Sequence, residues 1–122
     1  MTDEIRLVIP AEEEFRPVAH LVTGGLALRL DMTYDALDDL QTGIDALLAL
    51  RDDPGDVVVS LDVGEGALHA TVGPFQGDAL RGLERDEGEL GLRRVLETVV
   101  DTFEVEERDG GAYVELIKKA AS

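Results

Sequence analysis

The order of the periodic segments constrains the fold of this chain more than any other feature. Five short segments alternate apolar and polar residues, as strands with one buried face do. They are residues 4–9, 57–63, 68–72, 103–106 and 113–117. Three longer segments, residues 12–30, 34–51 and 92–100, repeat apolar residues every three or four positions, as amphipathic helices do. The order predicts an α/β two-layer sandwich, in which a mixed, mostly antiparallel sheet has three helices on one face.

Turn and cap residues separate these segments. Gly64-Glu65-Gly66 and Asp109-Gly110-Gly111 predict two hairpin turns, and Thr33 predicts the N-cap of the second helix. We expect Gly73-Pro74 to end the third strand. We expect Gly24-Gly25 to mark either a kink or a close helix crossing. A chain of 122 residues has room for a single domain, so we expect one domain over residues 1–122.

The charge of the chain is strongly negative, with 27 Asp and Glu against 11 Lys and Arg and a formal net charge of −16. Such a surface repels phosphate backbones and anionic lipids, so we expect neither a nucleic-acid partner nor a membrane partner. The absence of Cys excludes disulfides, thiolate zinc sites and a cysteine nucleophile. The N-terminal residues are acidic where a secretory signal would be basic, so we expect a cytoplasmic protein.

Four stretches of the sequence together carry a resemblance to a known family. They are residues 34–46, 89–96, 101–106 and 110–116. In this order and spacing the chain resembles the histidine-kinase-like (GHKL) ATPase superfamily, in particular the anti-sigma-factor serine kinases of bacterial partner-switching systems. The resemblance covers nearly the whole chain. It implies a histidine-kinase-like ATPase fold, with ATP and Mg²⁺ between the helices and a lid loop.

The first signature of that family lies on the second helix. A Glu there would polarise the attacking hydroxyl or water, and an Asn four residues later would bind Mg²⁺ through its oxygen. The matching positions here are Asp45 and Ala49. The resemblance therefore implies Asp45 as the catalytic residue and both positions as part of the nucleotide site. Asp45 keeps a carboxylate, whereas Ala49 offers a metal ion no ligand, and Asp45 is alternatively an ordinary solvated acid.

Three further signatures would hold the nucleotide. An Asp should read adenine after the third strand, a glycine-rich turn should bind phosphates at the start of the third helix, and a Gly-Thr pair should enter the last strand. By resemblance, the nucleotide-binding positions outside the second helix are Gly73, Gly88, Gly91 and Leu92.

Each of these three signatures differs here from the family pattern at a residue that would contact the nucleotide. No Asp stands next to Gly73, Glu89 places a carboxylate where phosphate would bind, and Ala112 replaces the threonine of the last signature. Each lost polar contact weakens binding by about 1 to 3 kcal/mol. Together the losses predict weak or absent nucleotide binding. The two histidines, His20 and His69, are too few for a multi-histidine metal site, and we predict no metal site.

These observations favour a non-catalytic regulatory module that keeps the kinase-like scaffold, needs no cofactor and binds a protein. Its partner would be a sigma factor, an anti-sigma antagonist or a kinase paralogue, and the chain itself could form a homodimer. The resemblance implies that residues 15–30 serve dimerisation and partner docking. One alternative is an active ATP- and Mg²⁺-dependent serine/threonine kinase acting on an anti-sigma antagonist. Another is a domain that binds a small ligand in the old nucleotide cleft.

Overall fold

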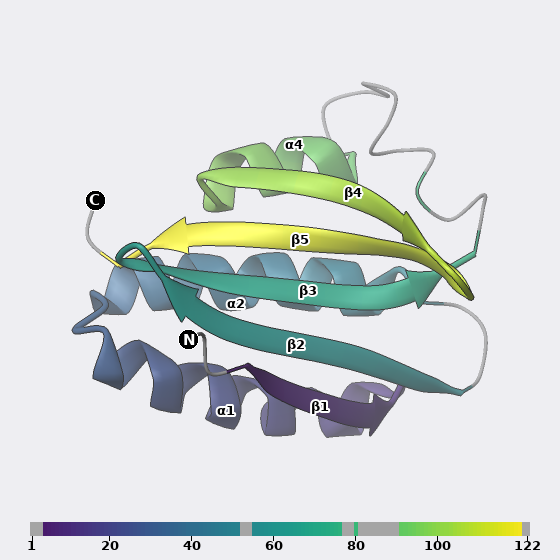
Figure 1. The fold of residues 1–122 in the computed structure, drawn as a ribbon, viewed down its shortest axis with the longest axis horizontal. Helices are drawn as coiled ribbons and strands as arrows, with labels where there is room; N and C mark the ends of the chain where they lie inside the picture. The colour runs from purple at the N-terminus through teal and green to yellow at the C-terminus, as the bar shows by residue number, and fades with distance from the viewer. Residues whose placement is uncertain (1–3, 52–54, 77–79, 81–90, 121–122) are drawn as a thin grey trace.

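A sheet and a layer of helices make up the structure, a computed structural model (Figure 1). It describes residues 4–51, 55–76, 80 and 91–120. The strands are β1 (Ile5–Pro10), β2 (Asp56–Gly64), β3 (Ala67–Phe75), β4 (Thr102–Arg108) and β5 (Gly111–Lys119). The helices are a 3-10 turn η1 (Glu13–Phe15), α1 (Arg16–Arg29), α2 (Tyr34–Ala49) and α4 (Leu92–Val99). The predicted two-layer α/β sandwich is confirmed.

The five strands form one sheet in the order β1-β2-β3-β5-β4. We expected a mixed, mostly antiparallel sheet, but every neighbouring pair of the described strands is antiparallel. The chain reverses three times between β1 and β2, because α1 and α2 both lie between them, and the two strands therefore run in opposite directions. β3 and β4 are not neighbours, because β5 inserts between them.

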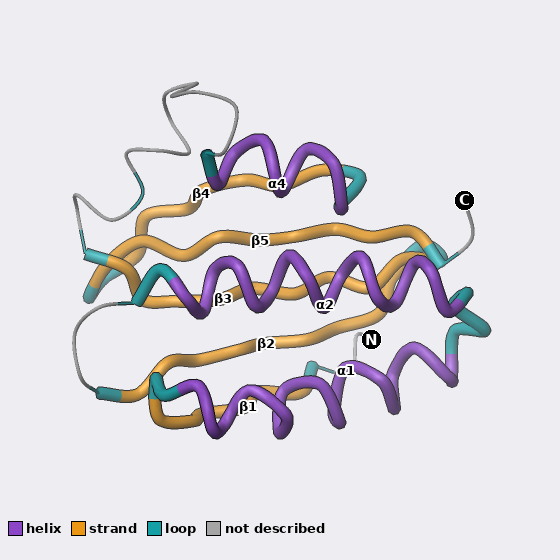
Figure 2. The backbone as a smooth tube through the Cα atoms, turned by 180° about the vertical axis from the view of Figure 1, so that it is seen from behind, coloured by secondary structure: helices purple, strands orange, loops and turns teal. Residues whose placement is uncertain are grey.

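The core lies between the sheet and the helices, which cover one of its faces (Figure 2). α2 crosses the middle of the sheet and contributes Leu40, Ile44 and Leu47, which are fully buried. The hydroxyl of Thr33 accepts a hydrogen bond from the Ala36 amide at 3.1 Å, which confirms the predicted N-cap of this helix. Gly43 lets α2 approach β5 closely, since a Cβ there would lie 3.2 Å from the Leu116 side chain.

One local prediction is wrong, and one of the two alternatives in a second prediction is excluded. β3 does not end at Gly73-Pro74 but continues to Phe75, which pairs with Ala112 of β5 after a register shift. The peptide bond between Gly73 and Pro74 is cis. α1 continues through Gly24-Gly25, and apart from the neighbouring backbone of α1 itself no atom of the described residues lies within 4 Å of a Cβ built at either glycine. The glycine pair therefore makes no close helix crossing.

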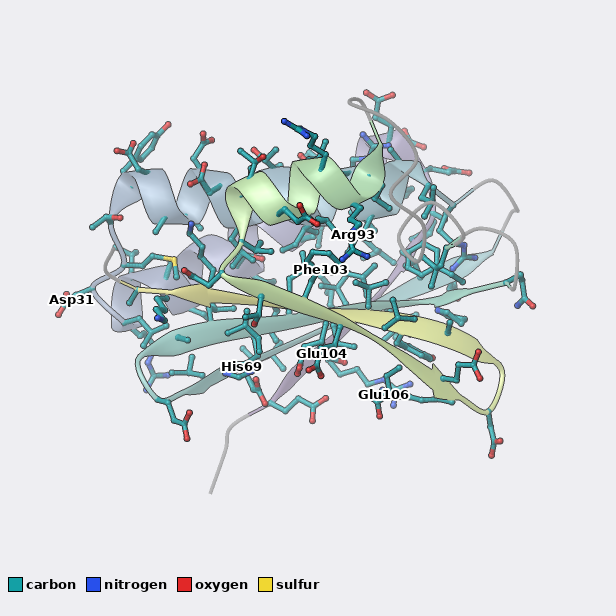
Figure 3. The ribbon with its side chains drawn as sticks, turned by 90° about the horizontal axis from the view of Figure 1, so that it is seen from above. Asp31, His69, Arg93, Phe103, Glu104 and Glu106 are labelled. Atoms are coloured by element: carbon teal, nitrogen blue, oxygen red, sulfur yellow. The ribbon has the colours of Figure 1, made fainter. Side chains whose placement is uncertain are left out.

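The second face of the sheet is free of helices among the described residues. Figure 3 shows His69, Glu104 and Glu106 on the side of the sheet that points away from the helices. This agrees with the alternation of the sequence, which places polar side chains on that face. None of the described helices is long and apolar enough to cross a membrane.

Candidate functional site

Asp45 contacts the neighbouring helix α1. Its Oδ1 lies 2.8 Å from Nε2 of His20, and both side chains are 35% exposed. One turn earlier on α2, the amide of Gln41 donates to the backbone carbonyl of His20 at 3.2 Å. The α2 flank that carries Gln41 and Asp45 therefore faces α1, and the predicted catalytic carboxylate is engaged there.

Gly43 identifies the opposite flank of α2. A Cβ at Gly43 would lie 3.4 Å from Val100 and 3.5 Å from Leu96 of α4. Each residue turns an α-helix by about 100°, so Asp45 lies about 200° and Ala49 about 240° around the helix from Gly43. The two positions predicted to bind the nucleotide from α2 therefore share one flank, but that flank faces away from α4.

Ala49 lines a cavity of about 60 Å³ at the end of α2. The other lining residues are Ile9, Pro10, Ala11, Glu12, Arg16, Leu48 and Arg51. A hydrogen bond with Glu14 is the main cause that raises the pKa of the Glu12 carboxyl above its ordinary value. Pockets for small organic ligands measure about 300 to 1,000 Å³, so this cavity can hold a few waters or a small ion but no nucleotide.

Gly73 is buried in β3, next to the ring of Tyr113 on β5. A Cβ at Gly73 would lie 2.5 Å from Cδ2 and 2.7 Å from Cγ of the Tyr113 ring, and 3.0 Å from the Ala112 carbonyl oxygen. Real Cβ atoms do not approach other atoms so closely. The close packing of the tyrosine ring therefore explains this glycine without any ligand.

Gly91 and Leu92 begin α4, as the sequence predicted. The carbonyl oxygen of Gly91 accepts hydrogen bonds from the amides of Arg94 at 3.1 Å and Val95 at 3.3 Å. Gly88 and Glu89, the other positions of this signature, lie outside the described residues. Figure 2 shows α2 between α1 and α4. Gly91 and Leu92 are therefore on the α4 side of α2, while Asp45 and Ala49 face α1.

The sequence analysis missed two positions on the α4 side of α2, Ala46 within the helix and Leu50, its C-cap residue. They lie about 60° and about 20° around the helix from Gly43. Like Asp45 and Ala49 they are four residues apart, so they form the same pair shifted by one position. Gly43 was the signal in the sequence that could have identified this flank, because a glycine within a helix often lies where a neighbouring element packs closely. Both side chains are hydrocarbon, and neither supplies an oxygen to Mg²⁺.

Other polar groups near this flank are already engaged. Asp39 lies about 40° from Gly43 on the same side of α2. Its Oδ2 is 3.4 Å from Nζ of Lys118 on β5. In the part of the chain that the structure describes, no three His, Cys, Asp or Glu side chains cluster in a way that could hold a metal ion.

Comparison with known proteins gives two matches over most of the chain, although no family model matches it. The serine-protein kinase RsbW of Bacillus velezensis is 29% identical over an alignment 131 positions long, gaps included, which covers 88% of this chain and 81% of that protein. The serine-protein kinase RsbW of Halalkalibacterium halodurans is 27% identical over an alignment 139 positions long, gaps included, which covers 95% of this chain and 83% of that protein. The chain is related to the anti-sigma-factor serine kinases.

This relationship agrees with the element order and the two-layer fold. A kinase must bind ATP with a metal ion. The residues on the two flanks of α2 can therefore be compared for the ligands that a metal ion needs. On the α1 flank the chain offers the carboxylate of Asp45, followed by Ala49. On the α4 flank it offers Ala46 and Leu50. Neither pair contains the amide oxygen that the family resemblance implies.

Proposed function

We propose that this chain is a regulatory protein-binding domain on a serine-kinase scaffold, and that it binds ATP weakly or not at all. The observation that carries the proposal is the composition of α2. Whichever flank faces the nucleotide, the residue at the magnesium position is a hydrocarbon, Ala49 or Leu50. The carboxylate that remains, Asp45, lies 2.8 Å from the ring of His20 on α1.

Electrostatics support weak nucleotide binding as well. ATP carries several negative charges, and the chain has a net charge of −16. A bound Mg²⁺ ion would offset part of this repulsion, but it needs oxygen ligands to stay in the site.

A calorimetric titration of the intact chain with Mg²⁺–ATP tests this part of the proposal. We expect no measurable heat of binding, or a dissociation constant above about 100 μM. A dissociation constant in the low micromolar range would contradict the proposal and favour the active serine/threonine kinase.

Two matched double variants then test whether the missing ligands limit binding. Ala46→Glu with Leu50→Asn places the Glu and Asn pair on the flank near α4, and Asp45→Glu with Ala49→Asn places it on the flank near α1. We expect tighter Mg²⁺–ATP binding only from the first pair, because only that flank faces the helix that Gly91 begins. A melting curve of each variant verifies folding. Equal affinities in the two folded variants would show that the α2 residues do not limit binding.

The first helix supports the protein-binding part of the proposal. Val18, Leu21 and Leu28 are 38%, 77% and 80% exposed, and with Gly25 they form one stripe at helical spacing, here named the α1 face. α1 contains two arginines and no acidic residue, although the whole chain has a net charge of −16. Two copies of so acidic a chain repel each other least where their surfaces lack acids. We therefore propose a second copy of the chain as the occupant of the α1 face.

Sedimentation equilibrium over a range of concentrations tests this dimer. We expect the parent chain to dimerise and Leu21→Glu or Leu28→Glu to weaken dimerisation at least about tenfold, because a buried carboxylate opposes association. Thr98→Glu, on the exposed surface of α4, is the control that adds the same charge elsewhere. A parent chain that stays monomeric at high concentration, or a control that loses the dimer equally, would overturn the assignment.

A further inference from the structure

β4 is an edge strand of the sheet. It is last in the strand order, and among the described strands it pairs with β5 alone. The backbone groups on its other side therefore have no strand partner in the described part of the chain. An open edge of this kind can pair with an extended segment of another chain.

An open cleft of about 500 Å³ runs between this strand and α4. Its floor includes Phe103 and Val105 of β4, and its α4 wall includes Arg93 and Glu97. The guanidinium of Arg93 lies 6.0 Å from the centre of the Phe103 ring, and its Nε donates to Glu97 at 2.8 Å. Figure 3 shows Arg93 and Phe103 between α4 and the sheet. The cleft thus combines an apolar floor with an ion pair on its α4 wall, and Asp101 adds one acid to its lining.

The other face of β4 is acidic. Side chains alternate between the two faces of a strand, so Glu104 and Glu106 point away from the cleft (Figure 3). Glu106 is paired with Arg108 at 3.0 Å. Glu104 lies directly opposite another acid, Glu115 of β5, and makes no ion pair with any described residue. On this face of β4, Glu104 is therefore the glutamate that has no ion pair with a described residue.

We propose that the β4 edge binds an extended segment of a partner protein as an additional strand. The segment would alternate apolar and basic residues. Its apolar side chains would enter the cleft over Phe103 and Val105, and its basic side chains would lie on the open face beside Glu104. Backbone hydrogen bonds would supply affinity, and the two rows of side chains would supply specificity.

Charge decides between this partner and a second copy of the chain. β4 carries three glutamates within Thr102–Arg108. Pairing two copies of β4 would place glutamates beside glutamates, and like charges on paired strands destabilise a sheet. The same acids protect the edge from self-association, yet they attract a basic strand.

This inference does not depend on the nucleotide site or on the α1 face. The probe is a blocked heptapeptide that alternates lysine and valine, matched to the seven residues of β4. We expect it to shift backbone amide resonances of β4 and α4 in ¹⁵N–¹H spectra. A peptide of the same composition with its lysines and valines in two blocks should bind at least about threefold more weakly, because it cannot fill both rows.

Two protein variants with the same change of charge locate the site. Glu104→Lys should weaken binding of the alternating peptide about three- to tenfold. Glu13→Lys, on exposed η1 far from β4 in the fold, should change it less than about twofold. An alternating peptide methylated at its backbone nitrogens should not bind, because it cannot form the strand hydrogen bonds.

Three results would overturn the inference. They are equal binding of the block peptide, equal effects of the two charge variants, or resonance shifts confined to other elements. Each would mean that the peptide does not bind as a strand at β4 and is attracted non-specifically by the acidic protein. None of them bears on the ATP titration or on the dimer of the α1 face, so the failure of this inference and that of the proposed function can be told apart.

Discussion

Replacing Gly73 by alanine tests whether this glycine serves packing, as the structure indicates, rather than nucleotide binding. Gly73 follows Val72, which pairs with Val114 of β5, and the register between β3 and β5 is irregular from there to Phe75. The added methyl group would lie 2.5 and 2.7 Å from two ring atoms of Tyr113 and 3.0 Å from the carbonyl oxygen of Ala112. The ring must therefore move, because the carbonyl belongs to the paired backbone of β5.

The cost follows from what the ring would lose. Overpacking by one methyl group typically costs about 1–3 kcal/mol. The Tyr113 ring also lies 4.7 Å from the guanidinium of Arg108, a cation–π contact worth about 0.5–1 kcal/mol at an exposed site. We expect Gly73→Ala to lower the free energy of unfolding by about 2 kcal/mol and the melting temperature by roughly 6–10 °C.

Urea unfolding of four proteins measures this in a double-mutant cycle: the parent, Gly73→Ala, Tyr113→Ala and the double variant. In the Tyr113→Ala background the two closest ring atoms are gone, so Gly73→Ala should cost less than half as much. A cost below about 0.5 kcal/mol in the parent background would refute the steric argument. An equal cost in both backgrounds would refute the assignment of the strain to the ring.

Further predictions concern stability and can be checked by thermal or urea unfolding. Leu40→Ala should cost about 2–5 kcal/mol, because Leu40 is fully buried at the centre of α2. Thr33→Ala should cost about 1 kcal/mol through the lost N-cap hydrogen bond, and Thr33→Ser should restore most of it. Asp45→Asn should cost less than about 1 kcal/mol, because its pair with His20 is partly exposed. The melting temperature should rise between about 0.05 and 0.5 M NaCl, because salt screens the repulsion within a chain of charge −16. Unfolding in EDTA without nucleotide should remain one cooperative transition, since the apolar core needs no metal ion.

The features that the sequence predicted well are those decided by neighbours along the chain. Thr33 caps α2 because its hydroxyl reaches an amide three residues later. The hairpin between β2 and β3 turns at Glu65 and Gly66, both with positive φ, as the glycine-rich sequence predicted. The predicted alternation of apolar and polar residues likewise agrees with the sheet, where Figure 3 shows His69 and Glu104 on the face without helices.

The end of β3 shows where such local reasoning fails. A Gly-Pro pair usually interrupts a strand, because proline has no amide hydrogen to donate. Here the strand resumes after an irregular register, and Phe75, which is 1% exposed, pairs with Ala112. Burial of a large side chain against a distant strand extends β3, and no pattern within residues 68–75 reveals that partner.

The same limit applies to the candidate site. The apolar period of α2 identifies Leu40, Ile44 and Leu47 as its buried stripe, but it does not say which flank meets α1 and which meets α4. That choice depends on the path of the chain through the whole fold. The family resemblance, with its spacing of four residues, selected Asp45 and Ala49. The contact with His20 places Asp45 beside α1, and Ala49 lines a cavity with Arg16 of α1. A shift of one residue moves a helical position by about 100°, which is enough to move it from one neighbour to the other.

When sequences diverge, a fold persists longer than the few residues that bind a nucleotide. This difference matters for a chain that is 27–29% identical to its relatives. Burial energy is spread over many aliphatic side chains, so one aliphatic residue can replace another while the layers persist. Nucleotide chemistry depends on a few oxygen atoms at fixed positions, and a single replacement removes a metal ligand altogether. On both flanks of α2 the position for that ligand holds a hydrocarbon, Ala49 or Leu50. We therefore expect the fold to be the part of the kinase relationship that this chain retains with least change, and we propose that surfaces such as the α1 face and the β4 edge carry a function that needs no ATP.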